Sequence, residues 1–124
     1  MELLKIEETK YTPEIIMNPE NGEISIKGKS YPENTFEFYE PIMKWLGNYF
    51  QNAQEKTIVN FEIVYFNSSS SKLFFDLFDL IDENSSTNDI QINWIYDEEN
   101  DSALEAGEDF KEDFENLNFN LVKK

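Results

Sequence analysis

Four consecutive serines, Ser68 to Ser71, are the residues of this chain whose type and spacing could do chemistry. They lie between a strand-like run that ends at Phe66 and a helix-like run that begins at Ser69 or Ser70. A phosphate on such a hydroxyl adds about −1.5 to −2 charges beside the unpaired N–H groups of a helix start. A helix cap is the alternative, since a serine oxygen accepts from the N–H of the next turn. One serine suffices for a cap, so a regulatory phosphorylation site and a capped loop both stay open.

The composition argues against most other chemistry. The chain has no His, the commonest general base and transition-metal ligand, and no Cys. The acidic run that starts at Asp97 has the opening of a calcium loop, but Ser102 stands where that loop requires glycine. No glycine-rich phosphate loop or nucleophile motif is present. We therefore predict no catalytic residue, no metal and no cofactor; a carboxylate-dependent enzyme would need two acids with displaced pKa values in an enclosed pocket.

The charge excludes two classes of partner. A net charge of −16 argues against nucleic acid and anionic membrane surfaces, which require basic patches. The start of the chain lacks a signal-peptide pattern and no apolar run would span a membrane, so we expect a cytoplasmic protein. Ten acids between Asp97 and Glu115, against Lys111 alone, form either a solvated helix face or a surface for a basic protein. A constitutive acidic adaptor is therefore the alternative function.

Hydrophobic periodicity predicts one α/β domain over residues 1–124, with a mixed sheet, helices packed against it and the order ββαβαβαβ. The expected strands are Glu14–Met17, Glu23–Lys27, Thr57–Phe66, Asp89–Tyr96 and about Asn118–Val122, and the expected helices are about Asn34–Ala53, from Ser69 or Ser70 to Asp82, and about Ser102–Phe114.

Two of these elements are unusually apolar. The strand Thr57–Phe66 has apolar residues on both faces, with Tyr65 beside Phe61 and Phe66 on the opposite face, which predicts a strand covered on both sides. The helix that follows the serines has an apolar arc wider than one sheet face covers. Phe75, at the edge of that arc, is a candidate for a partner surface or for burial under a neighbouring element.

Three stretches at matching spacing together resemble the SiaC-type regulatory phosphoproteins, small bacterial proteins whose fold resembles the STAS domain. They are Gly28-Lys29-Ser30-Tyr31-Pro32-Glu33-Asn34, then Tyr65-Phe66-Asn67-Ser68-Ser69-Ser70-Ser71-Lys72, then Trp94-Ile95-Tyr96 with Glu105-Ala106-Gly107-Glu108-Asp109-Phe110.

The resemblance covers about Ile6 to Phe114 and implies a non-catalytic partner-switching module. A Ser/Thr kinase would phosphorylate it and a PP2C-type phosphatase would restore it. Only one form would bind a downstream target, which in such systems can be a diguanylate cyclase of cyclic-di-GMP signalling.

The resemblance also implies site residues. The phosphoacceptor directly follows the Asn of the motif, which is Ser68 here, where the family usually has Thr; Ser69, Ser70 and Ser71 lie alongside. Ser68 would sit in a mostly neutral patch flanked by Phe66 and Phe75, and phosphorylation would repel an apolar or acidic partner. The expected partner-binding residues are Asn67, Lys72, Phe75, Tyr31 and Glu33.

Overall fold

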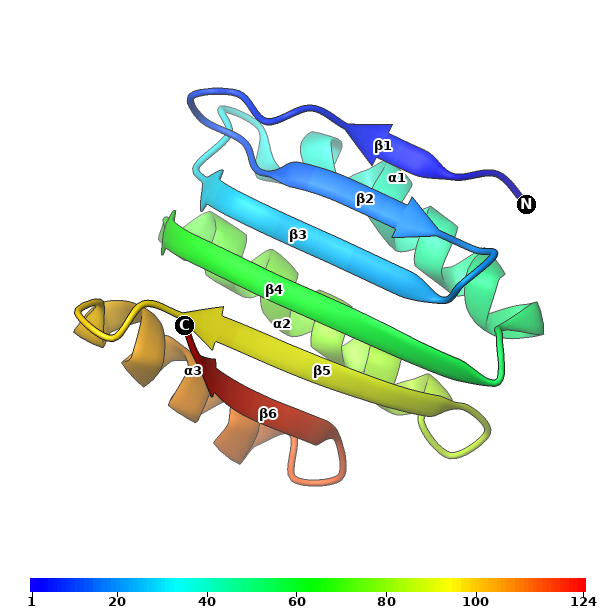
Figure 1. Cartoon of the computed structure of the whole chain (residues 1–124). Coiled ribbons are helices and arrows are strands. Elements are labelled where there is room, and N and C mark those ends of the chain that lie inside the picture. Colours follow the sequence, from blue (N-terminus) through cyan, green and yellow to red (C-terminus); the bar gives the residue numbers. More distant parts are fainter.

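One six-stranded sheet runs through the chain, and the computed structural model describes all residues, 1–124. Its strands are β1 Leu4–Ile6, β2 Glu14–Asn18, β3 Glu23–Ser30, β4 Lys56–Phe66, β5 Asp89–Tyr96 and β6 Asn118–Lys123. They lie side by side in sequence order; β1, β2 and β3 pair antiparallel, whereas β3 to β6 pair parallel (Figure 1). The predicted α/β fold with a mixed sheet is confirmed. The sequence did not predict β1, a three-residue edge strand too short to show a period.

Three helices connect the parallel strands: α1 Thr35–Tyr49, which continues as the 3-10 turn η1 Phe50–Asn52, α2 Ser68–Asn84, and α3 Asp101–Asp113. Each helix connects one parallel strand to the next, always in the same direction across the sheet. Because such connections are right-handed, all three helices lie on one face of the sheet (Figure 1). The opposite face has no covering layer. None of the helices combines the length and the apolarity that a bilayer crossing needs.

An asparagine side chain caps the start of every helix. The Oδ1 atoms of Asn34, Asn67 and Asn100 each accept from the backbone N–H three residues on, at 3.0, 2.9 and 3.1 Å. Each bond satisfies one of the N–H groups that a helix start leaves unpaired. The alternative in which a serine caps α2 is therefore wrong: Asn67 is the cap, and Ser68 is the first helical residue.

The core between the sheet and the helices is largely aromatic. Phe78 of α2 lies at its centre, with ring-centroid distances of 4.9 Å to Phe61, 5.0 Å to Phe110 and 5.3 Å to Phe119. α2 is the middle helix, so it contacts the sheet, α1 on one side and the aromatic residues of α3 on the other. These three contacts explain why its apolar arc is wider than one sheet face requires.

Near the carboxyl end of β4, the alternation of side chains between the two faces of the sheet is inverted. Its pairing with β3 passes from Ile63 to Tyr65, which leaves Val64 as one extra residue in β4. Beyond this bulge Tyr65 is 54% exposed and Phe66 packs on Phe74 at 5.4 Å, within the helix-side core. The faces predicted for Tyr65 and Phe66 are wrong, because one inserted residue inverts the alternation.

The second face of β4 is open, so the predicted double cover is also wrong. Polar pairs occupy that face. Asn60 Oδ1 accepts from Asn93 Nδ2 at 2.9 Å, and Glu62 Oε2 pairs with Lys124 Nζ at 2.8 Å. The hydrogen bond from Lys124 to Glu62 raises the pKa of the lysine ammonium above its ordinary value. Apolar residues on this face, such as Ile58, are half-buried by their neighbours in the sheet.

Candidate functional site

A surface groove of about 630 Å³ lies between α2 and α3, at the end of β4; we call it the α2–α3 groove. Its lining residues come from two regions about forty positions apart in the sequence, and they are Phe66, Ser68, Ser71, Lys72, Phe75, Asp76, Ala106, Asp109, Phe110 and Asp113. Four residues of the predicted site region, Ser68, Ser71, Lys72 and Phe75, meet here. The α3 residues were missed, because no local pattern shows which side of α3 faces α2.

Ser68 is exposed on the rim of this groove, at the first position of α2. Asn67 precedes it with extended backbone and caps the helix. Because N–H groups at a helix start face outwards and carry the positive end of the helix dipole, a negative group on Ser68 is locally favoured. A phosphate could therefore be added here without unfolding the helix.

The other three serines of the run occupy different environments. Ser69 is exposed, whereas Ser71 is half-buried and lines the groove. Ser70 is fully buried, and its Oγ donates to the Ser30 carbonyl at 2.9 Å. Ser70 does not fit a modification site, because a kinase cannot reach a hydroxyl that is buried and bonded in the core.

Ser70 belongs to a chain of three buried hydroxyls. Ser30 Oγ lies 2.7 Å from Ser70 Oγ and 2.6 Å from the hydroxyl of Tyr39. Burial raises the pKa of Tyr39 above its ordinary range, so its hydroxyl stays neutral. The Ser30 carbonyl also accepts from the Asn67 N–H at 3.1 Å. This chain ties the start of α2 to the end of β3 and to α1, and it holds Ser68 in place.

The groove is more acidic than the mostly neutral patch that the sequence predicted. The carboxylates of Asp76, Asp109 and Asp113 line it, against one cation, Lys72. Lys72 Nζ lies 3.8 Å from Asp76 Oδ2, in an exposed pair of the kind that contributes little. The prediction failed because two of these carboxylates come from α3. Asp109 and Asp113 are exposed and Asp76 is half-buried, whereas the enzyme alternative predicts two acids in an enclosed pocket.

The sequence left two environments open for Phe75, a partner surface and burial under a neighbouring element, and the structure shows an environment between the two. It is 42% exposed and lines the groove, and its ring lies 4.9 Å from that of Phe114, just beyond α3. The exposed part of Phe75 and the neighbouring Phe66, Ala106 and Phe110 give the groove an apolar floor.

α3, the second wall of the groove, approaches the sheet closely at Gly107. A Cβ atom at Gly107 would lie 2.5 Å from Cδ1 and 2.7 Å from Nε1 of Trp94. The same indole donates from Nε1 to the Ala103 carbonyl at 2.9 Å. Glycine at this position therefore sets the distance between α3 and β5.

Tyr31 and Glu33 lie apart from the groove. With Tyr11 they line a second depression of about 400 Å³, which we call the tyrosine hollow. Tyr31 is half-buried and Glu33 is exposed. The structure thus divides the predicted partner-binding residues between two sites, with Asn67 at the junction of β4 and α2. Tyr11 was missed, because its loop has no pattern that links it to residue 31.

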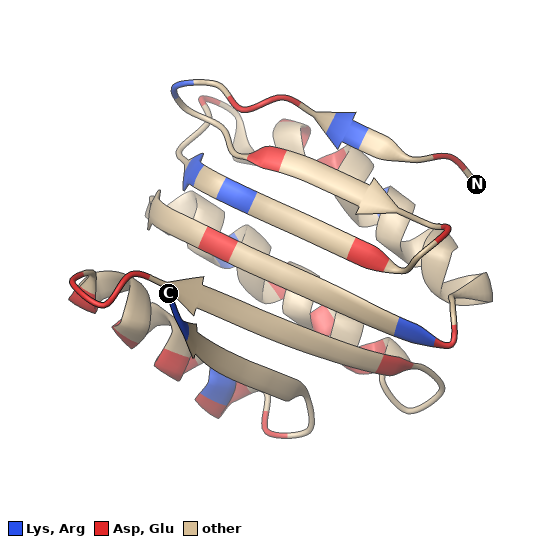
Figure 2. Ribbon diagram, in the orientation of Figure 1, with Lys and Arg blue, Asp and Glu red and all other residues tan.

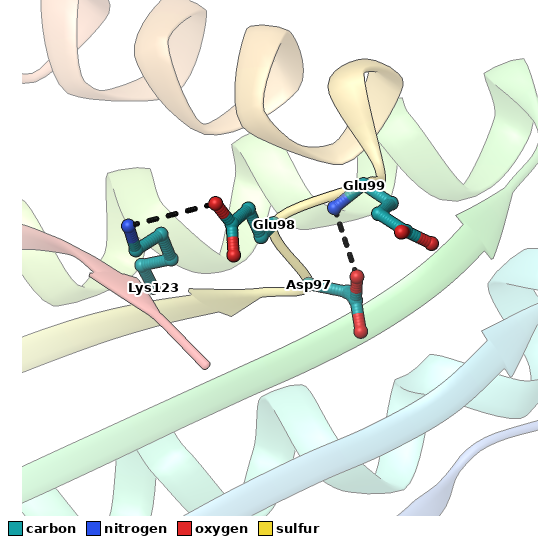
Figure 3. Close-up of polar contacts among 4 residues, drawn as sticks. All are labelled: Asp97, Glu98, Glu99 and Lys123. Carbon is teal, nitrogen blue, oxygen red and sulfur yellow. Dashed lines mark hydrogen bonds and ion pairs between the residues drawn. The ribbon is translucent and has the colours of Figure 1, made fainter.

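The acidic loop after β5 does not gather its carboxylates around one point. Asp97 Oδ1 accepts from the Glu99 N–H at 2.9 Å, and Glu98 Oε1 lies 4.0 Å from Lys123 Nζ (Figure 3). The carboxylate of Glu99 points away from both (Figure 3). No group of three or more His, Cys, Asp or Glu residues in the chain is placed to hold a metal ion.

Comparisons with known proteins agree on one family. The model of the family described as SiaC family regulatory phosphoprotein matches residues 6–124. An uncharacterised protein of Pseudomonas aeruginosa (strain UCBPP-PA14) is 32% identical over 111 residues, which are 89% of this chain and 88% of the relative.

Solved structures agree with this. SiaC of Pseudomonas aeruginosa is similar with a TM-score of 0.86 and 29% identity, over 100% of this chain and 98% of that one. A chain in the crystal structure of the diguanylate cyclase SiaD in complex with its activator SiaC, from the same species, has a TM-score of 0.85 and 29% identity, over 97% of each chain.

Proposed function

This chain belongs to the SiaC family of regulatory phosphoproteins, and on that premise we propose that it is a non-catalytic switch that binds a diguanylate cyclase and releases it when Ser68 is phosphorylated. A Ser/Thr kinase adds the phosphate and a PP2C-type phosphatase removes it. The proposal rests on the position of Ser68, an exposed hydroxyl at the start of α2 on the rim of the α2–α3 groove. It is supported by the similar SiaC, which is described as the activator of a diguanylate cyclase.

A phosphate on Ser68 stays exposed, because no cationic side chain nearby is free to draw it out of solvent. The sequence contains no arginine, the residue whose guanidinium pairs two oxygens of a phosphate at once. Lys72 lines the same groove, but its exposed ammonium already lies near Asp76. The modified group is therefore not drawn into a new internal contact, and its effect falls on whatever covers the groove.

Two opposing effects decide which form binds. A partner that covers Ser68 must remove water from the phosphate, and burial of an unpaired charge costs several kcal/mol. A basic partner, which the carboxylates of the groove favour, regains part of this by attraction, at about 1 kcal/mol for each exposed pair. Desolvation is the larger effect, so the unphosphorylated form binds the cyclase.

The test uses the tagged chain in its native cells. Phosphopeptide mass spectrometry under two growth conditions should find one phosphate on Ser68, and the diguanylate cyclase should co-purify when the phosphate is absent. Ser68→Ala should retain the cyclase under both conditions and keep cyclic-di-GMP at one level. Ser68→Asp should reduce co-purification at least about tenfold, which corresponds to about 1.4 kcal/mol.

Ser68→Asn is the matched control, because it has nearly the shape of Asp without the charge. If Ser68→Asn weakens binding to the cyclase as much as Ser68→Asp does, the shape of the side chain and not its charge controls release. If all three variants bind like the wild type while the kinase still controls cyclic-di-GMP, Ser68 is not the switch.

The acidic surface supports one alternative, a constitutive adaptor that holds a basic partner. Asp and Glu residues follow one another along α3 (Figure 2), and most of them are exposed. Binding of this kind should weaken steeply as the Debye length falls from about 10 Å at 0.1 M salt to about 3 Å at 1 M. It should also be the same for the wild type, Ser68→Ala and Ser68→Asp.

A further inference from the structure

Three tyrosines from separate segments meet at the carboxyl ends of β3 and β4. Tyr11 lies in the loop between β1 and β2, Tyr31 directly follows β3, and Tyr65 is near the end of β4. Tyr31 lies edge-to-face with both others, with ring centroids 5.3 Å from Tyr11 and 5.4 Å from Tyr65. The Tyr31 N–H donates to the Tyr11 carbonyl at 2.8 Å, so the backbone holds the first pair in register. The rings are thus positioned before any partner arrives.

Two of these rings are exposed, Tyr31 between them is half-buried, and none of the three hydroxyls has an internal partner. Tyr11 is 51% and Tyr65 54% exposed. The hydroxyls of Tyr39 and Tyr49 bond to buried side chains, at 2.6 and 2.8 Å, whereas those of the three clustered tyrosines make no hydrogen bond within the chain. Folding therefore does not require their polar groups, and tyrosine in such a position is typical of the centre of an interface.

The chemistry of the hollow favours a cation. Tyr11 and Tyr31 supply aromatic rings and Glu33 supplies a carboxylate in the same depression. The face of an aromatic ring attracts positive charge. One cation already uses this chemistry within the chain: Lys10 Nζ lies 5.8 Å from the centroid of the Tyr11 ring. The net charge of −16 attracts a basic partner to the whole molecule.

We propose that the tyrosine hollow binds an arginine side chain presented by a protein partner. A guanidinium is planar, stacks on an aromatic ring and pairs with a carboxylate through two parallel N–H bonds, so it uses the rings and Glu33 together. An ammonium can use only one of the two contacts well. The chain has no arginine of its own, so the partner must supply it. This site shares no lining residue with the α2–α3 groove.

The experiment follows the tyrosine rings by NMR in the full chain labelled at tyrosine. The probe is a blocked Gly-Arg-Gly peptide, and the matched peptides carry lysine or citrulline, which has the shape of arginine without its charge. We expect saturable shifts of the Tyr11 and Tyr31 ring signals with a dissociation constant of about 1 mM, and none for the buried Tyr39 and Tyr49. The lysine peptide should bind at least about threefold more weakly, and the citrulline peptide should not saturate.

Two variants with the same net charge test the role of the carboxylate. Glu33→Gln should weaken the arginine peptide about two- to fivefold, as expected for one partly exposed ion pair. Glu20→Gln, in the β2–β3 turn at the opposite end of the sheet, should leave it unchanged.

Three results would overturn the proposal. The first is that the Tyr11 and Tyr31 ring signals do not shift at about 10 mM arginine peptide, a concentration that fills about nine-tenths of a site with a millimolar dissociation constant. The second is that the citrulline peptide binds as tightly as the arginine peptide. The third is that Glu33→Gln and Glu20→Gln change the binding of the arginine peptide equally.

Discussion

Replacement of Gly107 by alanine tests the close approach of α3 to β5. The new Cβ would lie 2.5 Å from Cδ1 and 2.7 Å from Nε1 of Trp94, and 2.9 Å from Cδ2 of Leu121. Trp94 is fully buried among other aromatic rings and cannot move aside, so α3 must shift outwards. The shift would also weaken the hydrogen bond from the indole to the Ala103 carbonyl.

The size of the effect follows from three contributions. Overpacking of a core costs about 1–3 kcal/mol, and a buried indole N–H left without its partner costs about 1–3 kcal/mol. Alanine recovers about 1 kcal/mol through its higher helix propensity. The net loss in the free energy of unfolding therefore lies between about 1 and 5 kcal/mol, and the midpoint of about 3 kcal/mol lowers the melting temperature by roughly 10 °C in a chain of this size.

Gly47→Ala is the matched control, because Gly47 also lies in a helix, α1, and a Cβ atom there meets nothing within 4 Å. Urea unfolding followed by circular dichroism should show Gly107→Ala destabilised and Gly47→Ala stabilised by about 0.5–1 kcal/mol. If Gly107→Ala is as stable as the wild type, or the two variants change in the same direction, α3 does not lie as close to Trp94 as described.

Three further predictions concern the start of α2 and the open face of the sheet. Asn67→Ala removes the cap of α2 and should lower the free energy of unfolding by about 1 kcal/mol in urea melts. Ser70→Ala breaks the buried hydroxyl chain and should cost about 1–3 kcal/mol, whereas Ser69→Ala should stay within about 0.5 kcal/mol; equal effects would contradict the different burial of the two serines. The raised pKa of Lys124 means that its pairing with Glu62 is fully present below the pKa of the unfolded chain and is lost as pH rises through the higher folded value. Glu62→Gln should therefore lower the Lys124 pKa measured by NMR, and an unchanged titration would exclude the pair.

Much of the fold could be predicted from the sequence, because the signals are local. The helix that became α2 and the strands β4 and β5 show their apolar periods within single segments, and residues beside them supply the caps and turns. The wrong faces predicted for Tyr65 and Phe66 came from the bulge at Val64. A bulge depends on how two strands pair, and the sequence of one strand does not contain that information.

The candidate site was predictable only in part. The serine run marked the junction of β4 and α2, and the resemblance singled out Ser68 within it. The acidic wall of the groove was not foreseen, because Asp109 and Asp113 approach Ser68 only when α3 packs beside α2. The tyrosine hollow brings Tyr11 beside Tyr31, and Tyr31 also lies against Tyr65; these three residues are neighbours only through the order of the strands.

The sequence by itself determined the alternation of strands and helices, the negative charge, the absence of His, Cys and Arg, and the place of a hydroxyl run at a helix start. These properties depend on residue types and on spacings within one segment. Only the tertiary structure decided which of the four serines are exposed and which are buried. Ser68 faces solvent, whereas Ser70, two residues later on the helix, faces the core and bonds to Ser30, forty positions away. The reason is physical: residue type states what a side chain can do, but its accessibility depends on what the rest of the chain packs against it.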